Sequence, residues 1–288
     1  MRLRDSESLY LSKGGMKMNT LELVKSRRSV RTFDGKAPDK ETVMDIMQHA
    51  YTTTNPYNLP ITWKVMSAKK NGLSTPVISG TDAFIAGKLQ KAPHAEEAFG
   101  YAFENIVLYA QSKGIGTTWI AGTMDRPAFE RAMQLEENEV MPCISPLGYP
   151  AKKLSIREGM MRKAVKADSR LPFEELFYAD TFAEPLSEES SGTFANALEI
   201  VRWAPSAVNK QPWRIVIAGN DVHFYEKHSR GYVGEDGWDI QKIDMGIALC
   251  HFLKGMEEEG RTCEFFISDP GIEVPAGTEY IASFHVAE

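Results

Sequence analysis

The sequence has few cysteines and no long apolar run, and these absences exclude several classes of protein. Cys143, Cys250 and Cys263 are the only cysteines among 288 residues, and none belongs to a C-x-x-C pair. An odd number of widely spaced cysteines argues against a disulfide framework and a cysteine-ligated zinc site. No segment approaches the roughly 18 consecutive apolar residues of a membrane span, and the N-terminus lacks a signal-peptide core. We therefore expect a cytoplasmic protein without membrane contact.

Excess positive charge and clustered histidines are missing as well. The formal net charge is −6, which argues against a general nucleic-acid-binding protein. The six histidines are scattered and form no H-x-x-x-H pair, so we expect no metal site. Gly114-Ile115-Gly116 follows a helical pattern and lacks the third glycine of a dinucleotide-binding fingerprint. The sequence therefore predicts neither metal catalysis nor a Rossmann-type cofactor site.

A dense polar cluster follows the first predicted helix. That helix begins at Asn19 or Thr20 and leads into Ser26-Arg27-Arg28-Ser29-Val30-Arg31. Guanidinium groups pair bidentately with phosphate oxygens, and a serine hydroxyl adds a further hydrogen bond. The cluster suits a phosphomonoester, and a solvated basic surface is the alternative that the composition leaves open.

A stiff polar loop lies late in the chain, at residues 204–214. Pro205 and Pro212 fix φ and each removes a backbone donor, while Ser206 and Asn209 carry short polar side chains. Taken alone, the loop is a connector between a helix and a strand. A ligand-binding role for it requires a partner elsewhere in the chain.

Apolar periodicity predicts both helices and strands along the chain. The expected helices begin at Asp39, Ala95, Pro127 and Thr193, and the expected strands cover residues 62–67, 140–145 and 214–218. Trp119 and Trp213 each adjoin a predicted strand, so we expect both in the core. Residues 69–93 cannot be assigned, 152–170 are expected to form a solvated crossing segment, and 186–193 are expected to form a linker.

One apolar stripe occurs twice, 146 residues apart. Phe99, Ala102, Phe103, Ile106, Val107, Ala110 and the terminal Gly114 correspond to Met245, Ala248, Leu249, Phe252, Leu253, Met256 and Gly260. Two such helices can bury their stripes against each other as homodimer subunits do. We therefore expect an intramolecular pseudo-dimer, with an N-terminal extension (1–18), a first half (19–175) and an incomplete second half (176–288). Because only the first half contains the arginine cluster, we expect one complete site in a monomer.

Several motifs together resemble the nitroreductase-like flavoprotein family, and more closely its fused, duplicated members. The matching segments are Arg27-Arg28-Ser29-Val30-Arg31-Thr32-Phe33, Gly114-Ile115-Gly116-Thr117-Thr118-Trp119-Ile120-Ala121-Gly122, Gly148-Tyr149-Pro150, Ser169-Arg170-Leu171-Pro172 and Ala204-Pro205-Ser206-Ala207-Val208-Asn209-Lys210-Gln211-Pro212-Trp213. The resemblance implies an α+β fold of mostly antiparallel sheets wrapped by helices, with FMN bound between subunits. In one duplicated chain, FMN would lie between the two halves.

The resemblance also implies a set of FMN-binding residues. The phosphate and ribityl chain would be held by Arg27, Ser29 and Arg31, with Arg28 nearby and Arg170 reaching the phosphate. The flavin ring would lie along the two segments formed by Ile120, Ala121 and Gly122 and by Pro205, Ser206, Ala207 and Asn209. A lysine that the family often has before the C-terminal arginine is Asp168 here, and Lys163 or Lys166 is a candidate replacement.

The function implied by the resemblance is that of an FMN-dependent oxidoreductase. NADH or NADPH would reduce the flavin, and an electron-poor small molecule such as a nitroaromatic or a quinone would then take the electrons. FMN carries the redox chemistry, so the protein need not supply a catalytic side chain. The alternatives left open are a protein that only stores or senses FMN and a structural protein without flavin.

Overall fold

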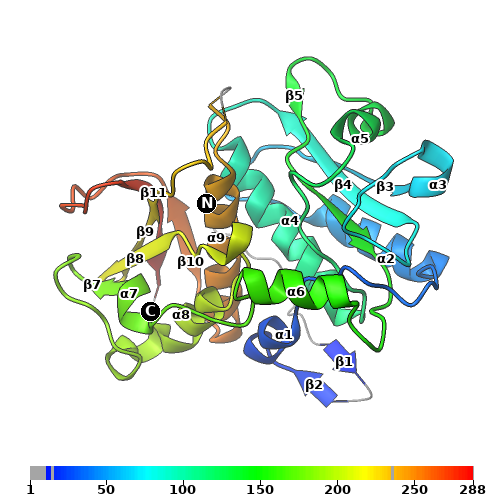
Figure 1. The fold of residues 1–288 in the computed structure, drawn as a ribbon. Helices are drawn as coiled ribbons and strands as arrows, with labels where there is room; N and C mark the ends of the chain where they lie inside the picture. The colour runs from blue at the N-terminus through cyan, green and yellow to red at the C-terminus, as the bar shows by residue number, and fades with distance from the viewer. Residues whose placement is uncertain (1–10, 14–15, 235–236, 288) are drawn as a thin grey trace.

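Two long helices, α4 (Ala95–Ser112) and α9 (Ile240–Glu258), pack against each other at the centre of the molecule (Figure 1). The computed structural model describes residues 11–13, 16–234 and 237–287. All apolar positions of the repeated stripe are buried in these two helices. Gly114 and Gly260 follow the helices with φ of +75° and +71°, the left-handed conformation expected at a helix end. Both predicted core helices are confirmed.

Glycines let the backbones of α4 and α9 approach very closely. A Cβ added at Gly100 would lie 2.1 Å from the carbonyl oxygen of Ile243, and one added at Gly246 would lie 2.1 Å from that of Glu97. Adding 146 to positions 97 and 100 gives 243 and 246, so each contact is the counterpart of the other. A twofold axis between two equivalent helices produces this reciprocal pattern. The two helices therefore meet as subunits of a symmetric dimer would.

A mostly antiparallel sheet lies beside each helix, as predicted. In the first sheet, β4 pairs with β3 on one side and with β5 and β6 on the other, and all of these pairs are antiparallel. These strands are β3 (Thr62–Ser67), β4 (Ala83–Gln90), β5 (Glu139–Val140) and β6 (Ile144–Leu147).

The second sheet has the order β10-β11-β9-β8-β7, and only its β7–β8 pair is parallel. Its strands are β7 (Phe177–Ala179), β8 (Trp213–Ala218), β9 (Asp221–Lys227), β10 (Cys263–Phe266) and β11 (Thr278–Val286). One apolar core includes residues of both halves, among them Phe99, Leu147, Trp213 and Phe252. The boundary between residues 175 and 176 stays a prediction.

Two of the shorter helices, α1 and α2, carry the capping residues that their sequences predict. Asn19 and Glu22 form a reciprocal capping box at the start of α1, and the carboxylate of Asp39 caps α2. The shorter helices include α1 (Thr20–Ser26), α2 (Lys40–Thr52), α3 (Ala68–Asn71), α5 (Arg126–Met133), α7 (Phe173–Leu176) and α8 (Ala195–Arg202). Within the described residues, no helix has both the length and the apolarity to cross a bilayer.

Four predicted segments differ from the structure. The strand expected at 140–145 is interrupted, because residues 141–143 separate β5 from β6. Residues 152–170 contain a helix, α6 (Ile156–Ala164), which is capped by Ser155 and buries Glu158. Residues 186–193 are not an extended linker, because Leu186 is buried and a 3₁₀ turn begins at Glu189. Of the N-terminal extension, residues 1–10, 14 and 15 lie outside the described part of the chain. Its strands β1 (Leu11–Lys13) and β2 (Met16–Met18) pair antiparallel.

Candidate functional site

The first-half motifs come together around the segment that follows α1. The amide of Val30 donates to the carbonyl of Thr117 at 2.8 Å, and the amide of Asp34 donates to that of Tyr149 at 3.0 Å. Packing also explains two motif glycines: a Cβ at Gly116 would lie 2.8 Å from the Val30 side chain, and one at Gly148 would lie 2.7 Å from the ring of Phe33. The arginine-bearing segment is thus held against the 114–122 and 148–150 motifs by backbone bonds and close packing.

Arg27 is the C-cap residue of α1 and carries guanidinium donors that the described residues do not use. Its Nε and Nη1 atoms are buried without a hydrogen-bond partner. Burial lowers the pKa of Arg27, partly offset by attraction to Glu104. The Glu104 oxygens are themselves bound, one to Trp119 Nε1 and the other to His251 Nε2, each at 3.0 Å. The open donors of Arg27 are therefore suited to an anionic ligand.

Arg170 lies close enough to Arg27 to be affected by its charge. Burial, followed by repulsion from Arg27, lowers the pKa of Arg170 to about 10. Its guanidinium carbon lies 4.6 Å from the centroid of the Trp203 ring, and Nη1 donates to the carbonyls of Ala167 and Ser169 at 3.0 and 2.7 Å. Its Nε is buried and unpartnered in the described structure. Two partly unsatisfied guanidinium groups thus face one region, the electrostatic pattern of an anion site.

Arg162 is a member of this cluster that the sequence analysis missed. It lies on α6 with a side chain only 15% exposed. Burial is the main cause of the lowered pKa of Arg27, Arg31 and Arg170, and the charge of Arg162 adds to the lowering of all three. Asp168, expected to weaken the positive field, forms an ion pair with Arg162. The sequence does contain a signal for Arg162. It lies four residues after Glu158, and this spacing places both side chains on one face of a helix capped by Ser155.

Arg28 differs from Arg27 and Arg170 because its guanidinium group forms an ion pair with a buried carboxylate. Its Nη1 atom lies 2.6 Å from Glu158 Oε1, and the Glu158 side chain is fully buried. This contact attaches α6 to the segment after α1. The structure therefore brings Arg27, Arg162 and Arg170 together, with Arg31 within electrostatic range of Arg162, and it commits Arg28 to holding α6 in place.

The loop at 205–209 is fastened to the segment that carries Arg170. The Asn209 side-chain amide donates to the carbonyls of Lys166 and Ser169 at 2.9 and 3.1 Å. Gln211 accepts a hydrogen bond from the amide of Leu171 at 2.9 Å. These hydrogen bonds place the loop beside the arginine cluster, although Arg170 and Pro205 are 35 residues apart in sequence.

Internal hydrogen bonds make the loop rigid. Ser206 Oγ accepts from the amide of Gln211 at 2.8 Å, and the amide of Ala207 donates to both carboxylate oxygens of buried Asp244, each at 3.0 Å. Burial raises the pKa of Asp244 well above its ordinary value. Val208 adopts φ of +52°, which is strained for a β-branched residue, and such strain concentrates at functional sites.

The Ile120–Gly122 segment lies between the first sheet and α5. Both backbone groups of Ile120 bond to Ile144, at 3.0 and 2.9 Å. The carbonyl of Ala121 accepts from Arg126 Nη2 at 2.8 Å, and Gly122 is exposed with open space where a Cβ would stand. Trp213 is fully buried, and half-buried Trp119 packs among core aromatics.

Arg126 also lines a groove with a volume of about 640 Å³ between α5 and the segments 231–234 and 238–240. The lining includes aromatic Tyr232 and Trp238 and the acidic Glu130 and Glu139. Because Arg126 bonds to the carbonyl of Ala121, this groove adjoins the 120–122 segment. A concave surface of this size can accommodate a small organic molecule.

Known proteins share both the sequence pattern and the fold. The family model described as "Putative TM nitroreductase" matches residues 19–256. A Thermotoga maritima structure described as a "putative nitroreductase" is 21% identical with a TM-score of 0.60, over 96% of this chain and 97% of that one. No curated protein sequence matches the chain.

Shorter nitroreductase structures match about half of the chain. An FMN-dependent nitroreductase from Clostridium difficile is 19% identical with a TM-score of 0.40, over 46% of this chain and 88% of its own. A nitroreductase family protein from Clostridium novyi is 21% identical with a TM-score of 0.41, over 47% and 87%. Since the family model covers most of the residues, the chain belongs to this nitroreductase family, a family of oxidoreductases.

Proposed function

We propose that the chain binds one FMN between its two halves and acts as an NAD(P)H-dependent oxidoreductase. The observation that carries this proposal is the convergence of Arg27, Arg162 and Arg170, two of which have buried donors without partners. A phosphate dianion supplies several acceptor oxygens for those donors and offsets the mutual repulsion of the arginines. The 205–209 loop is fastened beside them and offers the second wall of the site.

The roles proposed for the other residues follow from the resemblance to nitroreductases and, for Asn209, from its contacts. Ser29 and Arg31 continue the phosphate-binding segment, while Pro205, Ser206 and Ala207 face the ring from the second half. Because the Asn209 amide donates to two carbonyls, its Oδ1 atom is the one left to accept a hydrogen bond from the flavin. Ile120, Ala121 and Gly122 supply the opposite boundary.

The protein's own contribution is positioning and electrostatics. When bound, FMN supplies hydride acceptance from NADH or NADPH and electron transfer to an acceptor. The groove beside Ala121 is where we expect an electron-poor small molecule, of the nitroaromatic or quinone type, to bind. The arginine cluster would fix one end of the cofactor, and the loop, which is held by hydrogen bonds at Ala207 and Asn209, would keep the flavin ring in one position.

The first test is whether the purified protein binds FMN, measured by its visible absorption after incubation with the cofactor. We expect one FMN per chain, in a particle with the mass of a monomer. A colourless protein that takes up no FMN would refute the proposal.

Anaerobic addition of NADH or NADPH to the FMN-bound protein should then bleach the flavin band, and a nitroaromatic should restore it. A bound flavin that never bleaches would support storage or sensing instead.

A substitution at Arg27 tests the site itself. Arg27→Met should weaken FMN binding roughly 10- to 100-fold, because it removes charge-assisted hydrogen bonds to phosphate. Thermal stability without FMN should not fall, since the change removes a buried charge without hydrogen bonds at two of its donors. Arg131→Ala, on the exposed side of α5, is the matched control and should leave FMN affinity unchanged. Equal affinity of the Arg27 variant and the wild type would remove Arg27 from the site.

A further inference from the structure

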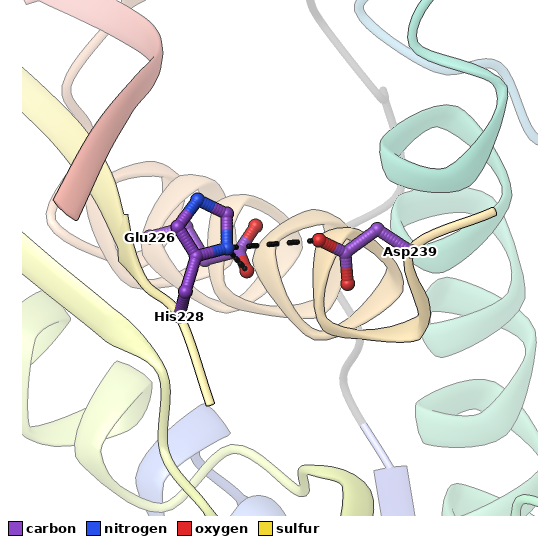
Figure 2. A group of neighbouring side chains, drawn as sticks. All are labelled: Glu226, His228 and Asp239. Carbon is purple, nitrogen blue, oxygen red and sulfur yellow. Dashed lines mark ion pairs between the residues drawn. The ribbon is translucent and has the colours of Figure 1, made fainter. Parts of the chain in front are cut away.

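A second group of ionisable side chains lies away from the arginine cluster, where β9 ends and α9 begins. Glu226 and His228 project from the same face of the chain because they are two residues apart in an extended segment. Asp239 is the N-cap of α9. One ligand atom from each of the three residues lies within 4.8 Å of the others, and Figure 2 shows the side chains pointing toward one another.

Glu226 is the unusual member of this group. Its side chain is fully buried, and neither carboxylate oxygen accepts a hydrogen bond from the described residues. Oε1 lies 2.8 Å from His228 Nδ1, and Oε2 has no partner. A buried carboxylate is stable only when a cation or several hydrogen bonds compensate it. Among the described residues, His228 is the cationic partner of this carboxylate through Oε1, and Oε2 stays available to a further cation.

Neighbouring groups orient His228 and Asp239 so that one possible ligand atom of each faces Glu226. His228 Nε2 lies 3.3 Å from Glu279 Oε2, and Glu279 is held by Lys242 at 2.9 Å. A hydrogen bond from Nε2–H to Glu279 leaves the lone pair of Nδ1 facing Glu226. Asp239 Oδ1 accepts the amide of Gln241 at 2.9 Å, while Oδ2 lies 3.7 Å from His228 Nδ1. A carboxylate on the distal nitrogen is the usual outer support of a metal-binding histidine.

We propose that Glu226, His228 and Asp239 bind one divalent transition-metal ion of the Zn²⁺ type. Two carboxylates neutralise the ion, and one imidazole favours a borderline metal over Mg²⁺ or Ca²⁺. Metal bonds of roughly 2.0–2.2 Å place ligand atoms about 3 to 3.6 Å apart, close to the 2.8 and 3.7 Å separations present. His228 is exposed, which leaves a path for the ion and room for water as a further ligand.

The sequence spacing gave no sign of this site. Glu226 and His228 are two positions apart, but Asp239 lies eleven positions beyond His228. The three residues therefore match no short metal-binding motif, and the expectation of no metal rested on such motifs. The site is independent of the proposed flavin phosphate position. His251 shows how far apart the two sites are. Its Nε2 atom bonds to Glu104, near Arg27. It lies twelve residues beyond Asp239 on α9, or roughly 18 Å along the helix axis. We assign the ion a structural role, joining the end of β9 to the start of α9.

The test is direct metal binding by the full chain after chelator treatment and dialysis, with Zn²⁺ as the probe in calorimetry and elemental analysis. We expect one Zn²⁺ per chain. Glu226→Gln and His228→Gln should each weaken Zn²⁺ binding at least 100-fold, and Glu279→Gln should weaken it 10- to 100-fold through the histidine. His285→Gln is the matched control. His285 forms an exposed pair with Asp221 at 2.6 Å elsewhere in the sheet, and its loss should leave the affinity unchanged.

Thermal unfolding separates a metal site from a purely ionic network. Without metal, Glu226→Gln should be at least as stable as the wild type, because it removes a fully buried carboxylate of which only Oε1 has an ionic partner, His228. Zn²⁺ should raise the melting temperature of the wild type and not that of the variant. Failure of the wild type to bind Zn²⁺, or equal binding by wild type and Glu226→Gln, would overturn the proposal. Neither readout depends on FMN, so the result stands whether or not the chain binds flavin.

Discussion

Arg27 and Arg28 are neighbours in sequence and have opposite environments in the fold. In an extended segment consecutive side chains point to opposite sides, and Arg27 is C-cap with φ of −70° and ψ of 134°. Arg28 therefore reaches buried Glu158 on α6, while the Nε and Nη1 donors of Arg27 stay without a partner in the described structure. The unsatisfied arginine is the one suited to a ligand, and the satisfied one positions the helix that brings Arg162.

Two histidines should change the stability with pH in opposite directions. Burial lowers the pKa of His223, outweighing Asp221 and Asp269, so stability is lost as pH falls below the ordinary value of about 6.5. A hydrogen bond to Glu97 raises the pKa of His94, so its contribution is present below about 6.5 and is lost as pH rises through the raised pKa.

Urea unfolding at several pH values between 5 and 8 measures both contributions. His223→Gln should reduce the loss of unfolding free energy on the acidic side, and His94→Gln should reduce the loss on the alkaline side. Each variant serves as the other's control, because both remove one histidine and leave the other titrating. The same pH profile for both variants would contradict these assignments.

At the level of single residues, sequence motifs could group Arg27 with Arg170, and the structure places the two guanidinium groups within electrostatic range of each other. The motifs could not predict Arg162, because its role depends on where α6 packs. That helix exposes Ile156 (84%) and Met160 (63%) while it buries Glu158. The apolar residues of α6 thus lie on its exposed side. An amphipathic helix is normally recognised by apolar residues on its buried side.

The crossing of α4 and α9 depends on Gly100 and Gly246. A methyl group at either position would overlap a backbone carbonyl at 2.1 Å, and two packed helices can relieve such a clash only by moving apart. Gly100→Ala and Gly246→Ala should each lower the free energy of unfolding by about 2 kcal/mol or more, as overpacking does. The gain in helix propensity from alanine, about 1 kcal/mol, is too small to compensate.

Chemical denaturation of the two variants measures this effect, with Gly159→Ala as the matched control. Gly159 lies inside α6 with nothing within 4 Å of an added Cβ, so alanine there should raise the free energy of unfolding by about 0.5–1 kcal/mol. If all three substitutions had the same effect, helix propensity and not the helix crossing would explain the data.

Among the elements, the sequence repeat predicted the α4–α9 pair, since both apolar stripes follow a single helical period. It could not predict the charged contact within that pair. Glu104 and His251 are both fully buried and lie 3.0 Å apart across the two helices. Their counterparts after a shift of 146 positions are Cys250 and Asn105, so the contact breaks the symmetry. Departures from a repeat depend on what surrounds each helix, which periodicity does not encode.

For the molecule as a whole, the two halves are joined by one continuous core. Helix α9 is buried along nearly all of its length, and its neighbours include α4 from the first half and α8 and β9 from the second. Neither half can cover its own central helix alone, and an uncovered apolar helix of this length is not stable in water. The chain should therefore unfold as one cooperative unit in spite of its internal repeat.

Hydrogen exchange under native conditions tests this cooperativity. Amides in the middle of α4 and α9 should exchange only through global unfolding, so the opening free energies of the two helices should agree within about 1.4 kcal/mol, a tenfold range in rate. Amides of α6, whose outward face is exposed, should exchange faster and serve as the internal control. If α9 opened while α4 stayed protected, the halves would be separate folding units. In that case the second half could unfold while the first half stayed folded. The proposed FMN site, which takes residues from both halves, would then be lost without global unfolding.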